Sequence, residues 1–121
     1  MPKFKLTETD SYWWPVKVRV PDPENAGKII EQELEILFEP EDQDTALNAQ
    51  EEYASLMTPR ERIEHERDQL LRVCKNWRGL DGDLPFSEAA FRQALTKSWF
   101  RIGVYSAYGQ SLNGEAARLG N

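Results

Sequence analysis

Hydrophobic and polar positions alternate along the first third of the chain. In residues 12–20 the even positions 16, 18 and 20 are valines, whereas Lys17 and Arg19 lie between them. Residues 28–39 repeat the alternation, with apolar side chains at 30, 34, 36 and 38 and glutamates at 31, 33 and 35. A period of two is typical of a strand with one buried face. The turn formers of PDPENAG separate the two runs, so the pattern predicts an antiparallel hairpin.

In this hairpin Lys17 and Arg19 share the outer face with the glutamates. Opposite charges on neighbouring strands contribute about 0.2–1 kcal/mol per pair. A helix is the alternative for the second run, because positions 30, 34, 37 and 38 also fit one helical face. The strand is preferred because Pro40 ends the run early and its partner strand is clear.

The hydrophobic period becomes helical after residue 43. Asp44 or Thr45 can cap a first helix, which carries apolar positions at 46, 47, 53, 54, 56 and 57. Thr58-Pro59 followed by Glu61 is a capping box with proline at the first helical position. We expect this second helix to extend to about Asn76, with an apolar stripe formed by Ile63, Leu70, Leu71, Cys74 and Trp77.

A connector then joins these helices to a C-terminal pair. Asp81-Gly82 predicts a tight turn, Pro85 ends regular structure, and Ser87 caps a third helix over 88–97. Ala90, Phe91 and Leu95 should face inward from it. A fourth helix is predicted over 98–112, carrying Phe100, Val104, Ala107, Tyr108 and Leu112 before the stop signal Asn113-Gly114.

These elements predict an α+β fold in one domain, residues 1–121. Its N-terminal antiparallel hairpin, with two or three strands, is followed by about four helices. The expected regions are a hairpin (1–40), charged helices (43–76), a connector (77–87), a C-terminal helix pair (88–113) and a frayed tail (114–121).

Charge and cysteine usage narrow the class of protein. The net charge is −6, and residues 31–52 hold nine acidic side chains and no basic one, which argues against nucleic acid as the main partner. The single cysteine, the lack of a signal peptide and the lack of an apolar run of about 20 residues predict a cytoplasmic protein without a membrane span.

Candidate catalytic and metal-binding residues are few. His65, the single histidine, lies in a charged helical run and is interpreted as an exposed helix residue, and Cys74 lies on the apolar stripe as a buried thiol. A calcium loop counted from Asp81 would need glycine at Phe86 and glutamate at Arg92. We therefore expect no enzyme activity, no cofactor and no metal.

Some aromatic residues exceed the needs of a narrow apolar face. Trp13 and Trp14 are neighbours on a strand, and Trp99 and Phe100 are neighbours on a helix, so each pair points in two directions. Spare aromatic side chains often form protein contacts. The four residues are therefore candidate partner-binding positions, although a small domain can also use them to fill its core. The exposed edges of a hairpin favour self-association.

Residues 71–121 resemble the C-terminal half of the tail assembly chaperones of long-tailed bacteriophages and prophages. The matching elements are Trp77-Arg78-Gly79-Leu80, an Asp/Gly turn, Leu84-Pro85-Phe86-Ser87 opening a helix, and an aromatic-rich helix through Trp99 and Tyr108. Trp77, Gly79, Pro85, Phe86 and Ser87 form its structural motif. The N-terminal half is similar through Trp14-Pro15-Val16 and a second strand, whereas residues 40–70 add nothing diagnostic.

The resemblance implies a non-catalytic protein of the host bacterial cytoplasm. Such chaperones bind the tape-measure protein, keep it soluble, recruit tail-tube subunits, and are absent from the finished tail. A second, longer product made by ribosomal frameshifting is also implied. The exposed hairpin edges separately predict a homo-oligomer. Two alternatives remain, namely a permanent minor tail or connector protein and a small enzyme or regulatory binding protein.

Overall fold

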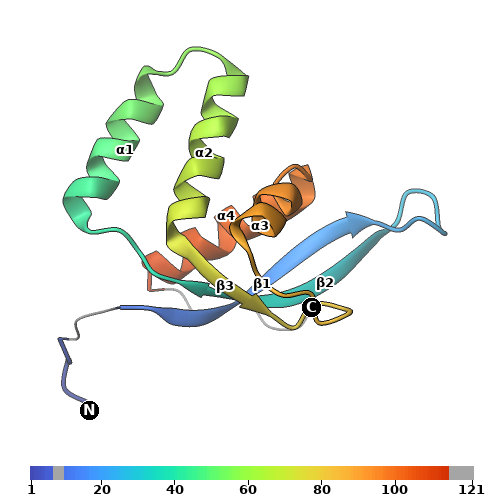
Figure 1. The fold of residues 1–121 in the computed structure, drawn as a ribbon, viewed down its shortest axis with the longest axis horizontal. Coiled ribbons are helices and arrows are strands. Elements are labelled where there is room, and N and C mark those ends of the chain that lie inside the picture. Colours follow the sequence, from blue (N-terminus) through green and yellow to red (C-terminus); the bar gives the residue numbers. More distant parts are fainter. Residues whose placement is uncertain (7–9, 115–121) are drawn as a thin grey trace.

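The computed structural model of the chain describes residues 1–6 and 10–114, and in them it has an α+β fold (Figure 1). A three-stranded antiparallel sheet of order β1-β2-β3 is combined with four helices. The elements are β1 (Tyr12–Pro21), β2 (Ile29–Phe38), α1 (Gln43–Ser55), α2 (Pro59–Val73), β3 (Cys74–Arg78), α3 (Glu88–Ala94) and α4 (Ser98–Leu112). The predicted fold class is confirmed.

The predicted hairpin is confirmed together with its faces. β1 and β2 pair from Tyr12 opposite Phe38 to Pro21 opposite Ile29 without a shift in register. Lys17 lies opposite Glu33 and Arg19 opposite Glu31, as the charge pattern requires. On the other face the even positions are buried, namely Val16, Val18, Leu34, Ile36 and Phe38. Full burial of one such side chain stabilises a fold by about 1.5–3 kcal/mol.

A third strand completes the sheet, and it is formed by residues 74–78. Helix α2 ends at Val73, and Cys74–Arg78 continue as β3 along the second edge of β2, so the prediction of a helix to Asn76 was wrong. Trp77 pairs with Ile36 in the sheet and is buried there. The physical reason is tertiary, because extending the chain at Cys74 places both Cys74 and Trp77 in the core. The described residues 1–6 lie outside the sheet.

The direction of the backbone groups explains the prolines of β1. The N–H of Asp22 donates to the Lys28 carbonyl, and the N–H of Glu39 donates to the Val73 carbonyl. Because strand geometry has a period of two, odd residues of β2 direct their N–H and C=O groups towards β3, and odd residues of β1 direct theirs towards the outer edge. Pro15 and Pro21 are odd residues of β1, so the N–H that each proline lacks would have pointed to the outer edge. The prolines therefore remove no hydrogen bond between β1 and β2.

Helix α4 packs against β1 on the inner face of the sheet, and α3 packs against α2 above that face. Their buried residues are Phe91 from α3, Leu95 from the connection, and Val104, Ala107 and Tyr108 from α4. Phe91 and Leu95 are buried as predicted, Ala90 is half-buried, and Leu112 is exposed. Helix α4 lies close to β1 because Gly103 has no side chain. A Cβ there would stand 2.6 Å from the Lys17 carbonyl oxygen.

Helices α1 and α2 form an antiparallel pair that projects from the sheet (Figure 1). Asp42 caps α1 by accepting the Thr45 N–H at 2.8 Å, so neither Asp44 nor Thr45 is the cap. Thr58 caps α2 as predicted and accepts the Glu61 N–H at 3.2 Å. Among the apolar positions of the first helical pattern, Leu47, Tyr53 and Met57 are exposed.

The two ends of the chain complete the description. Gly114 has a φ of +71° just after α4, in agreement with the predicted stop signal. Residues 115–121 of the tail, which we predicted to fray, lie outside the described residues. Within the described residues, none of the helices has the length and apolar character needed to cross a bilayer.

Candidate protein-binding groove

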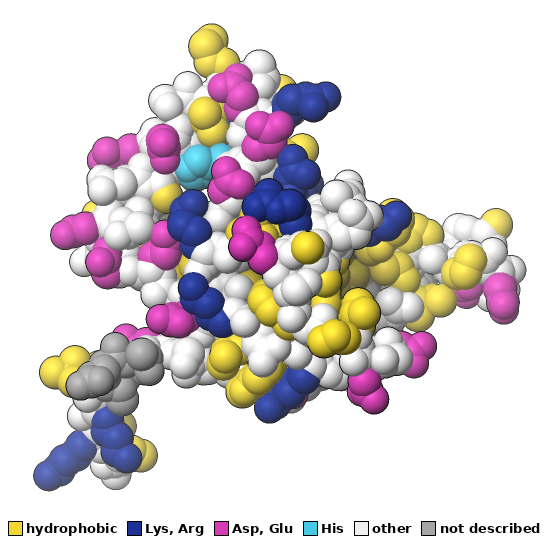
Figure 2. Space-filling model, in the orientation of Figure 1, with side chains coloured by type: hydrophobic (Ala, Val, Ile, Leu, Met, Phe, Trp, Pro, Cys, Tyr) yellow, Lys and Arg dark blue, Asp and Glu magenta, His cyan; other side chains and the backbone are white. Residues whose placement is uncertain are grey.

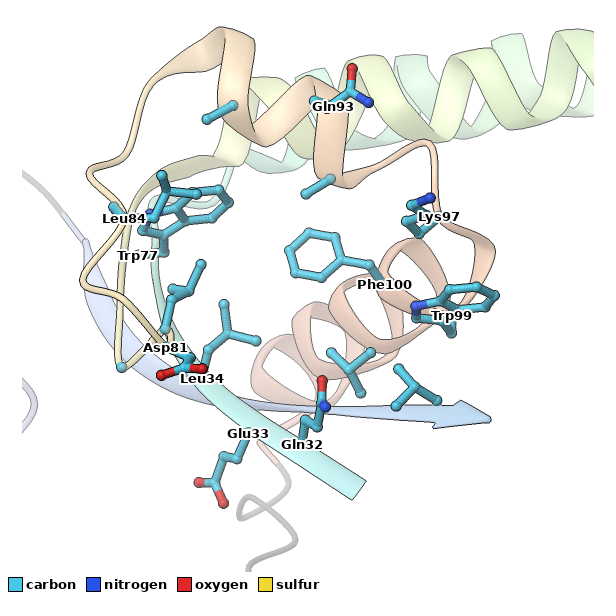
Figure 3. Close-up of a pocket in the computed structure, with 16 residues that line it drawn as sticks. Gln32, Glu33, Leu34, Trp77, Asp81, Leu84, Gln93, Lys97, Trp99 and Phe100 are labelled. Atoms are coloured by element: carbon cyan, nitrogen blue, oxygen red, sulfur yellow. The ribbon is translucent and has the colours of Figure 1, made fainter. Parts of the chain in front are cut away.

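A groove of about 630 Å³ lies between the helices α3 and α4 and the half of the hairpin that is nearer its loop (Figure 3). Its volume is within the range of about 300–1,000 Å³ that is typical of binding pockets. Most of its lining side chains are apolar. The lining residues are Val18, Val20, Gln32, Glu33, Leu34, Trp77, Gly79, Leu80, Asp81, Leu84, Ala90, Gln93, Ala94, Lys97, Trp99 and Phe100.

The floor of the groove is the inner face of the hairpin. Val18 and Leu34 are buried, whereas Val20 is only half-buried and Ile30, farther along the hairpin, is 36% exposed. The strands extend beyond the helices that cover them (Figure 1). The inward-facing positions of β1 and β2 therefore remain apolar beyond the end of the core, which leaves an uncovered apolar surface.

The turn of residues 79–84 forms one wall. Gly79 and Gly82 both have a φ of +82°, and the Asp83 N–H donates to the Leu80 carbonyl at 3.2 Å. The indole N–H of Trp77 donates to the Leu84 carbonyl at 2.8 Å and ties the turn to β3. This confirms the predicted tight turn.

An aromatic cluster supports the opposite wall. The rings of Trp77 and Phe86 meet edge to face with centroids 5.4 Å apart, and Phe91 lies 5.9 Å from Phe100. Ser87 caps α3 by accepting the Ala90 N–H at 3.0 Å, which fixes where that helix begins. The connector motif of Trp77, Gly79, Pro85, Phe86 and Ser87 therefore builds this part of the fold, with Trp77 buried and Phe86 half-buried.

Trp99 and Phe100 both line the groove. Phe100 points into it, and Trp99 stands at its rim with 41% of its surface exposed (Figure 3). Trp99 also begins an exposed apolar row on α4, which continues through Ile102 and Tyr105 at helical spacing. Two of the four predicted partner-binding residues are thus brought together at one surface.

Trp13 and Trp14 lie away from the groove and on opposite faces of β1. Trp13 is on the outer face, where the Arg78 guanidinium stacks at 4.0 Å from its ring centroid. Arg78 in turn donates to Glu35 at 2.7 Å. Trp14 is half-buried and meets Tyr12 edge to face at 6.0 Å. The structure therefore uses much of both rings in internal contacts.

The few charged groups at the groove stand at its margin. Glu33 points away from the cavity, and Lys97 lies beside Trp99 at the opposite side (Figure 3). Most acidic side chains visible in Figure 2 gather over α1 and α2, whereas hydrophobic side chains gather between α3 and the hairpin. The groove is thus an apolar surface on an otherwise acidic molecule.

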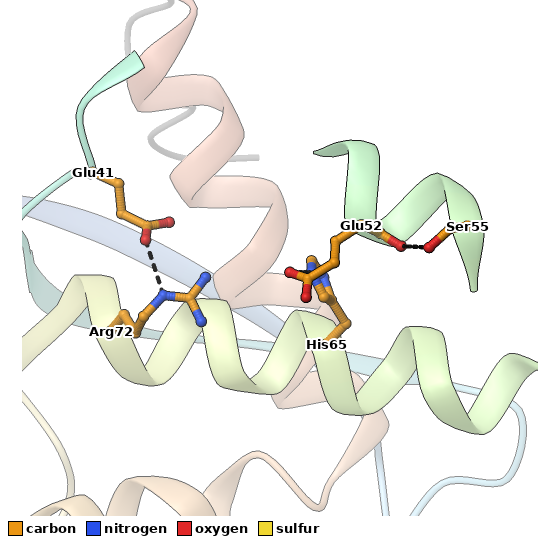
Figure 4. A network of polar contacts seen from close by, with 5 residues as sticks. All are labelled: Glu41, Glu52, Ser55, His65 and Arg72. Carbon is orange, nitrogen blue, oxygen red and sulfur yellow. Dashed lines mark hydrogen bonds and ion pairs between the residues drawn. The ribbon is translucent and has the colours of Figure 1, made fainter. Parts of the chain in front are cut away.

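The candidate chemical residues occupy structural positions. His65 holds α2 to α1 through Glu52, with Nε2 3.5 Å from the carboxylate (Figure 4). Its side chain is only 16% exposed, so the prediction of an exposed histidine was wrong. Nearby, Arg72 binds Glu41 at 2.9 Å. Packing against the neighbouring helix explains the burial of His65, because its ring lies 5.7 Å from that of Tyr53.

Cys74 is buried as predicted, and burial raises the pKa of its thiol. A buried thiol with a raised pKa is inert, because the thiolate is the reactive form. Over residues 1–6 and 10–114, no group of three or more His, Cys, Asp or Glu side chains is arranged to hold a metal ion.

Sequence reasoning did not identify the floor and the turn as part of a site. Val20 and Ile30 could have indicated the floor, because they continue the alternation of apolar residues along the hairpin. This alternation extends farther than a short helix pair can cover. Leu80 and Leu84 carried no comparable pattern. No known protein family, characterised protein or solved structure matches this chain.

Proposed function

We propose that this chain is a non-catalytic protein-binding chaperone that shields an apolar segment of a client protein in the groove between the hairpin and α3–α4. The observation that supports this best is the combination of an uncovered apolar floor with Trp99 at the rim and Phe100 inside. Trp is enriched among the hot spots of protein interfaces, and a bound client would cover the exposed part of Trp99.

The resemblance of residues 71–121 to tail assembly chaperones suggests the client. We propose the tape-measure protein, whose long apolar helical stripes would aggregate without cover. Recruitment of tail-tube subunits, a homo-oligomeric state and action in the host bacterial cytoplasm belong to the same proposal. The acidic surface supports it, because a strong net charge keeps a client complex soluble.

Co-expression with the tape-measure protein of the same genome tests the groove. Trp99→Ala should reduce the recovered complex about tenfold or more, since hot-spot side chains contribute 2 kcal/mol or more. Trp13→Ala on the outer face is the matched control and should leave the yield unchanged. Loss with Trp13→Ala alone would place the client on the outer face, and unchanged yields with both variants would contradict the proposal.

Mass spectrometry of purified virions separates a chaperone from a permanent tail component. A chaperone should be missing from the particles while present in the infected cell. Detection in stoichiometric amounts would instead indicate a minor tail or connector protein.

A further inference from the structure

Besides the outer edge of β1, the sheet has an open edge on β2, and this second edge lies beside the groove. Strand β3 pairs with β2 only from Phe38 to Glu35, and Gly79, with its φ of +82°, turns the chain away. Among the described residues, no strand lies beside residues 29–33 on that side, whereas Gly79 still lies next to Leu34. The odd residues Ile29, Glu31 and Glu33 direct their N–H and C=O groups there. An edge of this kind is a template for a further strand.

The two faces of this edge define which strand fits. On the outer face stand the exposed carboxylates of Glu31 and Glu33. On the inner face the edge borders the apolar groove through Gln32 and Leu34. A complementary strand must therefore alternate basic side chains on one face with apolar side chains on the other.

The chain itself contains such a segment. Residues 3–6 read Lys-Phe-Lys-Leu, a strict alternation of basic and apolar side chains. Phe4 is 90% exposed and Leu6 is 91% exposed, so both apolar side chains are uncovered in the single chain. Exposed large apolar residues on a segment without regular secondary structure are available for burial in a partner.

We propose that residues 3–6 of a second copy of this chain add to the open edge of β2 as a strand. In the antiparallel arrangement Lys5 stands opposite Glu31 and Lys3 opposite Glu33, on the outer face. Phe4 and Leu6 then project on the inner face, where Phe4 enters the groove beside Gln32. The interface combines backbone hydrogen bonds, two pairs of opposite charge and burial of an aromatic ring.

The length of chain between residues 6 and 12 favours a second copy over the same chain. In that arrangement Leu6 lies beside Ile30, eight residues along β2 from Phe38, or about 26 Å. Tyr12 is fixed opposite Phe38, and the six residue steps from Leu6 to Tyr12 span at most about 22 Å. Residues 1–6 also leave the sheet at the end opposite the hairpin loop (Figure 1). The same chain therefore cannot fill its own edge in the antiparallel orientation.

A cross-linking experiment without any client tests the interface separately from the proposed function. Lys5→Cys is introduced into a tagged chain and Glu31→Cys into an untagged chain, and the mixture is oxidised mildly. Directly opposite antiparallel residues have Cα atoms about 4.5–5.5 Å apart, which suits a disulfide. Cys74 is buried and adds no background. The expected product is a disulfide-linked pair of one tagged and one untagged chain.

Controls make each result decisive. Lys5→Cys with Glu24→Cys, in the exposed hairpin loop, measures random collisions and should give little product. Phe4→Ser with Leu6→Ser in the tagged chain should lower the yield about tenfold, and it cannot unfold the protein because both side chains are exposed. A Lys5→Cys, Glu31→Cys double variant that closes only within one chain would overturn the assignment to a second copy. Product at the collision level would overturn the interface altogether.

Discussion

Trp77 is the residue that connects the sheet, the turn and the aromatic cluster. It is 5% exposed, its indole N–H donates to the Leu84 carbonyl at 2.8 Å, and its ring meets Phe86 edge to face. Trp77→Phe removes the donor and part of the ring, so we expect a loss of about 1–3 kcal/mol in the free energy of unfolding. Urea denaturation measures it. Trp99→Phe at the exposed rim is the control and should stay within about 0.5 kcal/mol.

Tyr108 gives the fold a sensitivity to alkaline pH. Burial raises the pKa of its hydroxyl to about 12 from an ordinary value of 10.0. The folded state therefore holds the proton more tightly than the unfolded state between these values. Since the unfolded chain loses its proton first, this contribution to stability is fully present below pH 10 and falls as pH rises towards 12. Urea midpoints measured from pH 8 to 11.5 should decline at the alkaline end.

Tyr108→Phe is the control for this decline. It removes the ionisable hydroxyl, so the loss of stability above pH 10 should become shallower. Some decline will remain, because burial also raises the pKa of Tyr12 and of the Cys74 thiol. An identical alkaline profile in the variant would contradict the assignment to Tyr108.

At the scale of elements, the contact of α4 with β1 depends on Gly103. A Cβ at this position would lie 2.6 Å from the Lys17 carbonyl oxygen and 3.3 Å from Val18 Cγ2, so the helix must shift away from the strand. We expect Gly103→Ala to destabilise the protein by about 1–3 kcal/mol, although alanine is the better helix former. Thermal or urea unfolding measures the change.

Gly109 in the same helix provides the matched substitution. A Cβ at Gly109 meets nothing within 4 Å. Gly109→Ala should therefore raise stability by up to about 1 kcal/mol through helix propensity alone. Equal effects at the two positions would show that the close approach of α4 to β1 is unimportant.

The elements that sequence reasoning located are those with a local signal. The alternation of Val16 and Val18 with Lys17 and Arg19, and the caps at Thr58 and Ser87, depend on neighbours in sequence and were predicted correctly. Strand β3 could not be predicted, because no glycine, proline or cap separates Val73 from Cys74. Its strand state comes from the edge of β2 and from burial of Trp77, and both are long-range.

At the scale of the whole molecule, the groove exists because a long hairpin is covered by a short helix pair. The neighbouring aromatic residues in the sequence predicted two partner-binding pairs. Trp99 and Phe100 line the groove, whereas Trp13 and Trp14 do not. The sequence could not distinguish the two pairs, because the Trp13 ring stacks against Arg78. Arg78 belongs to strand β3, which the sequence did not predict. Position within the assembled fold decides which spare aromatic faces a partner.

The proposed interface and the proposed client use the same groove, so the two binding events should compete. Phe4→Ser with Leu6→Ser removes the apolar side chains of the segment that would enter the groove of a second copy. A chain that must release such a segment before binding has a lower apparent affinity, because only the open fraction is competent. The variant should therefore bind the tape-measure protein several-fold more tightly than the wild type. Titration at a chain concentration where the wild type self-associates measures the difference.

Ile63→Ser on α2, 37% exposed and outside the groove, is the control and should leave the affinity unchanged. Equal affinity in the Phe4/Leu6 variant would show that the segment and the client do not share the groove.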